Sequence, residues 1–181
     1  MMEEVQIQLS KSKLTLMALG SLTFVTIGLY FVINPSRFIS PIHRSVTYIF
    51  AGGLSAIIIF SFVGVYIFKK LLDKKPGLII SNEGIIDNSS SLSAGFVPWS
   101  DIIKIKEMII ANQKFICLIV KNPSDYFDRQ PNRIKRWLVE KNYKSFGAAI
   151  GISANGLKCN YDELKLLIQK KFVENKSKYI N

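Results

Sequence analysis

The side chains that most often bind metals or carry catalysis are few in this sequence. Its one histidine, His43, stands between Pro41 and Arg44 and has no Cys, Asp or Glu nearby to complete a metal-ligand set. The two cysteines, Cys117 and Cys159, show neither a metal-ligand spacing nor a disulfide framework. Because Cys117 lies inside an apolar run, we expect it to be a small core residue. No metal site and no cofactor are predicted.

Carboxylates and nucleophiles form no clearer pattern. Asp125 and Asp128 are the closest approach to a catalytic carboxylate pair, and their position suits the start or cap of a helix. The sequence contains no G-x-S-x-G motif and no phosphate-binding glycine loop. We therefore expect a protein that is not an enzyme.

One segment, 129–144, concentrates basic and aromatic side chains. If Pro131 begins a helix there, Ile134, Trp137 and Leu138 lie on one face. Such a helix can lie on anionic lipid, where each Lys or Arg contributes about 1 kcal/mol. Alternatively, the apolar face of this helix packs on the domain and its charged side chains face solvent. We expect this second arrangement. One compact patch with one tryptophan does not favour nucleic acid as the partner. The candidate residues for binding an anionic surface are Arg129, Arg133, Lys135, Arg136, Trp137, Lys141 and Lys144.

The elements that position these residues begin with two apolar stretches. Residues 14–33 and 47–68 contain no Asp, Glu, Lys or Arg, and each stretch is long enough to span a bilayer as a helix. Neither offers a polar face to water, so both are predicted to be transmembrane helices. The first is too long for a signal peptide, and Asn34 and Pro35 after it do not form a cleavage pattern. Without an ionisable residue, the two spans predict an anchor rather than a transport path.

Basic residues flank the predicted spans unequally. The outer flanks carry six lysines, whereas the loop 34–46 between the spans carries two arginines. Because cytoplasmic flanks are enriched in Lys and Arg, this pattern predicts a multi-pass protein of the cell membrane with both termini in the cytoplasm. Residues 1–13 are then a cytoplasmic segment, 34–46 a short external loop and 69–76 a basic juxtamembrane linker. The six lysines are Lys11, Lys13, Lys69, Lys70, Lys74 and Lys75.

Small residues occur along both predicted spans. They allow the backbones of two helices in lipid to approach closely, although glycine is also simply common in membrane helices. The small residues are Gly20, Gly28, Gly52, Gly53, Ala56 and Gly64.

The segment after Lys75 has the pattern of antiparallel strands. Runs at 78–80 and 85–86 are separated by turn residues and predict a hairpin. Pro98 in the following run indicates an edge strand or a bulge. Isoleucines alternate with lysines over 103–109, which predicts a strand with one wet face, whereas the apolar run 115–120 predicts a central strand covered on both faces.

A C-terminal helix is predicted over 160–174. Asn160 can cap it, with Glu163 three residues later completing a capping box. Its apolar residues recur at helical spacing and form one stripe: Tyr161, Leu164, Leu167, Ile168 and Phe172.

Two motifs carry a resemblance to a known family. The stretch Gly77-Leu-Ile-Ile-Ser-Asn-Glu-Gly-Ile-Ile-Asp87, followed by Val97-Pro-Trp-Ser-Asp-Ile102, is similar to bacterial membrane proteins in which two N-terminal helices precede a cytoplasmic pleckstrin-homology-like (PH-like) domain. The resemblance implies an α+β domain over 77–181. It would be an antiparallel barrel or sandwich closed by the C-terminal helix, with a helical insertion near 131–144.

The second motif is expected to be scaffold. Trp99 would close a strand against the core, and Ser100 or Asp101 would cap the turn before the next strand. The first hairpin turn carries Glu83 and lacks the basic cluster with which PH domains grip phosphoinositides. The function expected from all these features is a membrane-anchored, non-enzymatic adaptor that binds a protein partner. The alternative is a binder of anionic lipid or another polyanion through residues 129–144.

Overall fold

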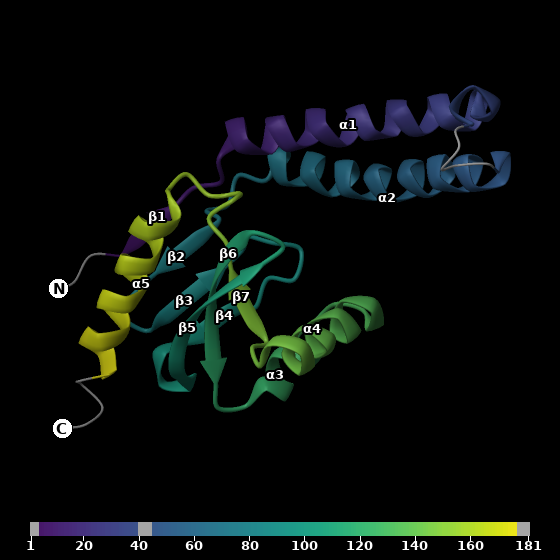
Figure 1. The fold of residues 1–181 in the computed structure, drawn as a ribbon. Coiled ribbons are helices and arrows are strands. Elements are labelled where there is room, and N and C mark those ends of the chain that lie inside the picture. Colours follow the sequence, from purple (N-terminus) through teal and green to yellow (C-terminus); the bar gives the residue numbers. More distant parts are fainter. Residues whose placement is uncertain (1–3, 40–44, 177–181) are drawn as a thin grey trace. The chain divides into compact units, whose positions relative to one another are not determined.

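The computed structural model describes residues 4–39 and 45–176 (Figure 1). These residues form two units. The helical hairpin comprises Lys11–Lys74, and the globular unit comprises the described residues up to Ser10 and from Lys75 onward. The globular unit is therefore assembled from chain on both sides of the hairpin.

The hairpin consists of α1 (Lys11–Ile33) and α2 (Val46–Leu72), with a short 3-10 turn at Pro35–Phe38. Both helices are long and apolar enough to cross a membrane, and they contain the spans expected at 14–33 and 47–68. Large apolar side chains are exposed along the length of both helices. A water-facing helix pair would not present such a surface, whereas hydrocarbon accommodates it.

Close contact between α1 and α2 depends on glycine. A Cβ atom on Gly28 would lie 2.8 Å from the Gly53 carbonyl oxygen, and one on Gly53 would lie 2.8 Å from the Gly28 carbonyl oxygen. Gly64 faces Ser21, whose Oγ would lie 3.1 Å from an added Cβ. Of the two interpretations that the sequence left open for its small residues, close helix packing holds at these positions. Two further glycines have no atom within 4 Å of the Cβ position and take no part in the contact: Gly20 and Gly52.

Lys11 has a structural role beyond its charge. Its Nζ donates hydrogen bonds to the carbonyl oxygens of Asp73 at 2.9 Å, Lys70 at 3.5 Å and Leu71. These carbonyls end α2, where the helix dipole is negative and a cation is favourable. The start of α1 is thereby joined to the end of α2.

The first sheet of the globular unit has four antiparallel strands in the order β1-β2-β3-β4. The predicted hairpin is confirmed as β2 (Leu78–Ile80) and β3 (Gly84–Asp87), and β4 (Gly95–Pro98) places Pro98 on an edge strand, as expected. The strand β1 (Val5–Ile7) was not predicted. It precedes the hairpin yet pairs with β2, with Val5 opposite Ile80 and Ile7 opposite Leu78.

The second sheet has three antiparallel strands in the order β5-β6-β7. They are β5 (Ile102–Ile110), β6 (Gln113–Val120) and β7 (Ile150–Ile152). The expectation of a central strand over 115–120 is confirmed, because β6 pairs on both sides and its consecutive residues Ile116, Cys117 and Leu118 are all buried. Strand β7 was not predicted.

The two sheets do not close into a barrel. Among the described residues, β4 and β5 do not pair with each other: the 3-10 turn Trp99–Asp101 separates them, and the β5–β6 register shifts between Ile102 and Lys104. The coarser prediction of antiparallel strands followed by a C-terminal helix is confirmed, whereas a closed barrel is not.

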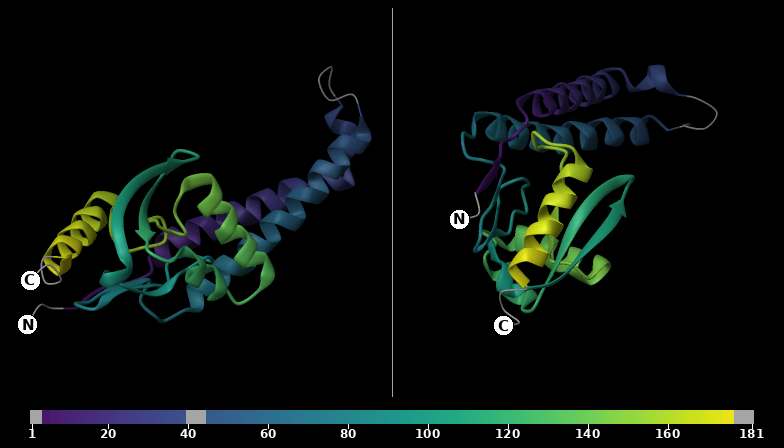
Figure 2. Two further views of the ribbon diagram at one scale, coloured as in Figure 1. Left: turned by 90° about the horizontal axis from the view of Figure 1, so that it is seen from below. Right: turned by 90° about the vertical axis from the view of Figure 1, so that its left-hand side faces the viewer.

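Three helices complete the globular unit, and they are α3 (Pro123–Asp128), α4 (Arg133–Phe146) and α5 (Tyr161–Lys176). The capping box of α5 is confirmed: Asn160 Oδ1 accepts from the Glu163 N–H at 2.8 Å, and Glu163 Oε2 accepts from the Asn160 N–H at 3.3 Å. The α3–α4 pair and α5 lie on opposite sides of β5 and β6 (Figures 1 and 2).

Candidate surface site on helix α4

The insertion that carries the basic segment is joined to the strands through α3. The Tyr126 hydroxyl, in a side chain that is only 1% exposed, donates to Asp101 Oδ2 at 2.9 Å. Burial, and then this hydrogen bond, raise the pKa of Tyr126 far above its ordinary value. Asp101 therefore binds α3, a role that differs from the expected cap of the turn. Sequence reasoning missed Tyr126, because a contact across 25 residues leaves no local pattern.

Helix α4 has clear local signals at both ends. Asn132 is the N-cap, and its side chain accepts from the Lys135 N–H at 2.9 Å. Gly147 ends the helix at φ 71°, a left-handed conformation that glycine adopts without strain. Pro131 was expected to begin the helix, but it lies just before the cap. Proline instead begins α3, at Pro123.

One side of α4 faces its own unit. Val139 is buried, and the Tyr143 ring packs on Phe127 of α3 at 5.6 Å between centroids. Arg136 forms ion pairs with Asp128, at 2.8 Å, and with Glu140, at 2.9 Å. Its hydrogen bond with Glu140 and the nearby Asp128 charge raise the pKa of the Arg136 guanidinium above its ordinary value.

The other side of α4 presents apolar side chains to the surroundings. Ile134 is 72% exposed and Trp137 is 55% exposed, so the expectation that both pack onto the domain is wrong. Lys141 Nζ lies 4.9 Å from the centroid of the Trp137 ring. At 3.6 residues per turn, Arg133 and Lys144 fall beside Trp137 on the same side. We call this set the outward face: Arg133, Ile134, Trp137, Lys141 and Lys144.

The remaining candidate residues do not belong to this face. Arg129 Nη1 donates to the Phe96 carbonyl oxygen at 2.6 Å, and its guanidinium lies 4.3 Å from the centroid of the Tyr126 ring. Arg136 is paired as described above, and Lys135 is half-buried on the flank of the helix. Of the seven residues predicted, the structure brings four together: Arg133, Trp137, Lys141 and Lys144.

Trp99 has the scaffold position that its motif predicted. Its side chain is buried, its Nε1 donates to the Ser81 carbonyl oxygen at 3.0 Å, and its ring lies near Phe172 of α5. It therefore connects the first hairpin turn to the C-terminal helix.

Residues with metal-binding or nucleophilic chemistry remain dispersed. Within residues 4–39 and 45–176, no three His, Cys, Asp or Glu side chains gather in a way that could hold a metal ion. Neither Cys117 nor Cys159 forms a disulfide, and burial raises the pKa of the Cys117 thiol. His43 lies outside the described residues.

Comparison of the chain with protein-family models, with curated proteins and with solved structures finds no match.

Proposed function

We propose that this protein is a membrane-anchored binding module without catalysis of its own, and that the outward face of α4 binds the anionic surface of the membrane. The observation that carries the proposal is the exposure of Trp137 and Ile134 beside three basic side chains. Arg133, Lys141 and Lys144 form no ion pair with any described residue. A tryptophan and an isoleucine flanked by cations match the interface between lipid head groups and acyl chains.

The magnitudes favour this contact when the module is tethered. Three basic side chains near an anionic surface contribute about 3 kcal/mol in total. A fully buried Trp or Ile side chain adds up to about 3 kcal/mol, and a shallow insertion adds a fraction of that. This is weak for a free domain. The hairpin, however, would hold the module at an effective concentration in the millimolar range, where a weak contact is occupied.

The connections to the hairpin are short enough for such a tether. Strand β1 ends at Ile7 and α1 begins at Lys11, whereas α2 ends at Leu72 and β2 begins at Leu78. A connection of this length spans at most about 20 Å. The excess of lysine at these ends supports a cytoplasmic location for the module, facing the inner leaflet of the cell membrane.

We also propose that the globular unit is PH-like. The order of elements supports this: a four-stranded antiparallel sheet, a three-stranded antiparallel sheet and a C-terminal helix whose buried residues Leu164 and Ile168 face the strands. The open junction between β4 and β5 is the point at which the unit departs from a closed barrel.

Fluorescence of Trp137 in the full chain tests the membrane contact. The protein is placed in nanodiscs of phosphatidylcholine alone or mixed with phosphatidylglycerol, with bromine-labelled acyl chains as quenchers. Trp137→Phe leaves Trp99 as the background. We expect the bromine labels to quench Trp137 fluorescence in the anionic nanodiscs only. This quenching should disappear at high salt, which screens the attraction between the basic side chains and the lipid.

Charge variants make the test specific. Arg133→Gln, Lys141→Gln and Lys144→Gln together should abolish the anionic-dependent quenching. A matched triple change of exposed lysines elsewhere, Lys121→Gln, Lys158→Gln and Lys170→Gln, removes the same charge and should retain it. Equal quenching in neutral and anionic discs, or an equal loss in both triple variants, would overturn the proposal.

A protein partner is the second candidate, and strand β5 is the observation that favours it. Among the described residues β5 pairs only with β6, so the other side of its backbone offers an edge to an extended peptide, and Ile103 and Ile109 on it are exposed. A photo-crosslinker at Ile109 in living cells should give one discrete protein adduct. The same group at exposed Lys170 should not, and equal adducts at both positions would count against this candidate.

A further inference from the structure

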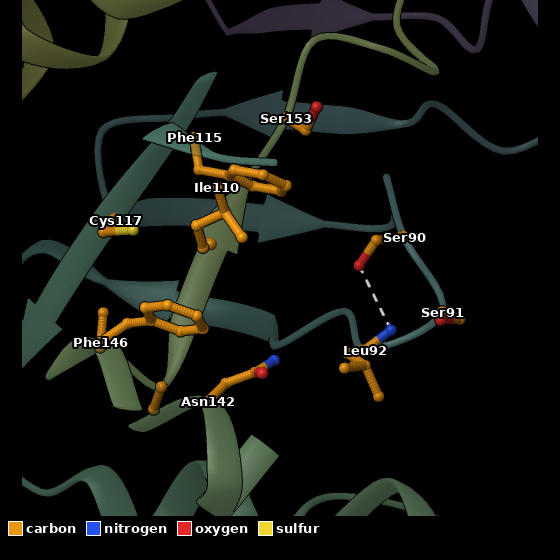
Figure 3. Close-up of a pocket in the computed structure, with 12 residues that line it drawn as sticks. Ser90, Ser91, Leu92, Ile110, Phe115, Cys117, Asn142, Phe146 and Ser153 are labelled. Atoms are coloured by element: carbon orange, nitrogen blue, oxygen red, sulfur yellow. Dashed lines mark hydrogen bonds between the residues drawn. The ribbon is translucent and has the colours of Figure 1, made fainter. Parts of the chain in front are cut away.

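A cavity of about 300 Å³ lies between the second sheet, the C-terminal end of α4 and the loop after β3 (Figure 3). Its apolar walls include Leu92, Ile110, Phe115 and Phe146. This cavity lies on the side of α4 opposite the outward face, so the proposed membrane contact makes no use of it.

The cavity exists because small residues line part of its wall. Ala148, Ala149 and Gly151 face it, where larger side chains would fill it. A Cβ atom on Gly151 would lie 3.7 Å from Phe115 Cδ1, which is an ordinary contact. The hollow is therefore a consequence of side-chain size, and a larger residue at position 151 has room to enter it.

The loop wall is held by a buried carboxylate. Asp87 is 3% exposed, and its Oδ1 accepts from the N–H of Ser89 at 2.9 Å and from its hydroxyl at 2.6 Å. Oδ2 accepts from the Ala94 N–H at 3.2 Å. These bonds fix both ends of the loop that brings Ser90, Ser91 and Leu92 to the cavity, so the wall is pre-formed.

One polar group in the wall has no partner of its own. The Asn142 carboxamide extends from α4 toward the cavity (Figure 3) and forms no hydrogen bond with any described residue. A carboxamide offers two donors and one acceptor oxygen. No acidic residue lines the cavity, and Lys106 lies directly opposite Cys117 in the β5–β6 register, on the same face of the sheet. These groups favour a neutral or negative polar group over a cation.

We propose that this cavity binds one medium-length aliphatic chain that carries a carboxylate or similar hydrogen-bonding head, which Asn142 holds. At roughly 30 Å³ for each methylene, about the volume share of a water molecule, 300 Å³ accommodates on the order of ten carbons. Pockets of this size and mixed lining, mostly apolar with few polar groups, are typical of small-ligand sites. The proposal does not rest on the membrane contact of α4.

Cys117 supplies a native reporter, because it lines the cavity and is buried, whereas Cys159 lies away from it. The full chain in nanodiscs is treated with N-ethylmaleimide at pH 8.5, since burial raises the pKa of the Cys117 thiol and slows its reaction at neutral pH. Modification of each cysteine is followed by mass spectrometry, with and without decanoate.

We expect decanoate at ten times its Kd to slow modification of Cys117 about tenfold, with no effect on Cys159. Decyltrimethylammonium, which has the same chain and a cationic head, should protect at least tenfold less well. A ten-carbon lysophosphatidylglycerol in a separate arm separates the two sources of such a chain: protection by it identifies a lipid, and protection by decanoate alone identifies a free carboxylate. Unchanged labelling of Cys117 in all arms would overturn the proposal.

Two variants keep the test independent of folding problems. Gly151→Leu fills the cavity and should abolish the rise in Tm that decanoate produces, whereas the matched change Gly20→Leu, at a position with no atom within 4 Å, should retain it. Asn142→Ala leaves the apolar walls intact and should weaken decanoate binding about tenfold without changing the Tm of the unliganded protein. Wild-type affinity in both cavity variants would refute the assignment.

Discussion

Several polar side chains in the globular unit join elements that are distant in sequence. Tyr126 connects α3 to Asp101, and Tyr161 of α5 donates to Glu107 of β5 at 2.8 Å, where Lys165 also pairs at 3.0 Å. Each of these bonds holds two elements of the unit together.

The partly buried hydrogen bond between Tyr126 and Asp101 predicts a stability change. Tyr126→Phe removes a hydrogen bond to a charged group, so the free energy of unfolding at pH 7 should fall by about 2 kcal/mol. Denaturant unfolding of the full chain, followed by Trp99 fluorescence, measures this. Tyr143→Phe, whose ring is partly exposed, is the control and should have little effect.

The same bond predicts a difference at alkaline pH. The pKa of Tyr126 is higher in the folded state than in the unfolded state. The stabilisation that its hydroxyl contributes is therefore fully present below the unfolded pKa of about 10, and it is lost as the pH rises toward the folded-state pKa. The difference in the free energy of unfolding between wild type and Tyr126→Phe should therefore become smaller above pH 10. A difference in the free energy of unfolding that stays constant up to pH 11.5 would contradict the assigned hydrogen bond.

At the scale of elements, the helical hairpin is specified by where its glycines fall. Gly28 and Gly53 permit backbone contact between α1 and α2, and the Phe24 and Phe60 rings stack at 4.3 Å nearby. If the hairpin spans a bilayer, lipid offers no hydrophobic drive for helix association, and this close packing then supplies much of the attraction.

The register of the two helices is testable with a disulfide. A Cβ on Gly64 would lie 3.9 Å from Ser21 Cβ, which is within the distance that a disulfide requires. Ser21→Cys with Gly64→Cys, in a chain whose native cysteines are replaced by Ala, should form an intramolecular bond on mild oxidation, visible on a non-reducing gel. Gly20→Cys with Gly64→Cys should not, and equal yields would contradict the register.

At the scale of the whole molecule, the helical hairpin is inserted in the chain between two strands that pair with each other. Strand β1 enters α1 and strand β2 leaves α2, and the two strands pair antiparallel. Further bonds tie the N-terminal segment to the late part of the chain: the Ser10 N–H donates to Gly156, and the Lys158 N–H donates to Gln8. The globular unit is thus incomplete without residues 4–10, and both outer ends of the hairpin are attached to one folded body.

This connectivity predicts the sidedness of the protein. If α1 and α2 span the membrane, Gln6 and Lys158 must lie on one side of it and Arg37 on the other. Single cysteines at these positions, in a chain without Cys117 and Cys159, are labelled in intact cells with a membrane-impermeant maleimide. We expect reaction at position 37 alone. Labelling of positions 6 and 158 from opposite sides would refute the arrangement.

Much of the fold follows from local patterns in the sequence. The uncharged stretches 14–33 and 47–68, the β2–β3 turn, the edge position of Pro98 and the Asn160–Glu163 capping box all follow from neighbouring residues. Each depends on hydrophobic periodicity or on a bond within a few residues, and such signals act before any tertiary contact exists. The basic character of 129–144 was likewise evident from composition.

Only the tertiary structure decided how these elements pack and which of their faces are exposed. Strands β1 and β7 have three residues each and are defined by partners far along the chain, so no local pattern marked them. Contacts with Phe127 and Asp128 of α3 fix the orientation of α4, in which Val139 is buried while Ile134 and Trp137 are exposed. The cavity beside Asn142 arises where distant elements meet around small side chains. The sequence by itself determined most of the elements and their chemistry, whereas long-range packing determined the two short strands and which faces remained exposed.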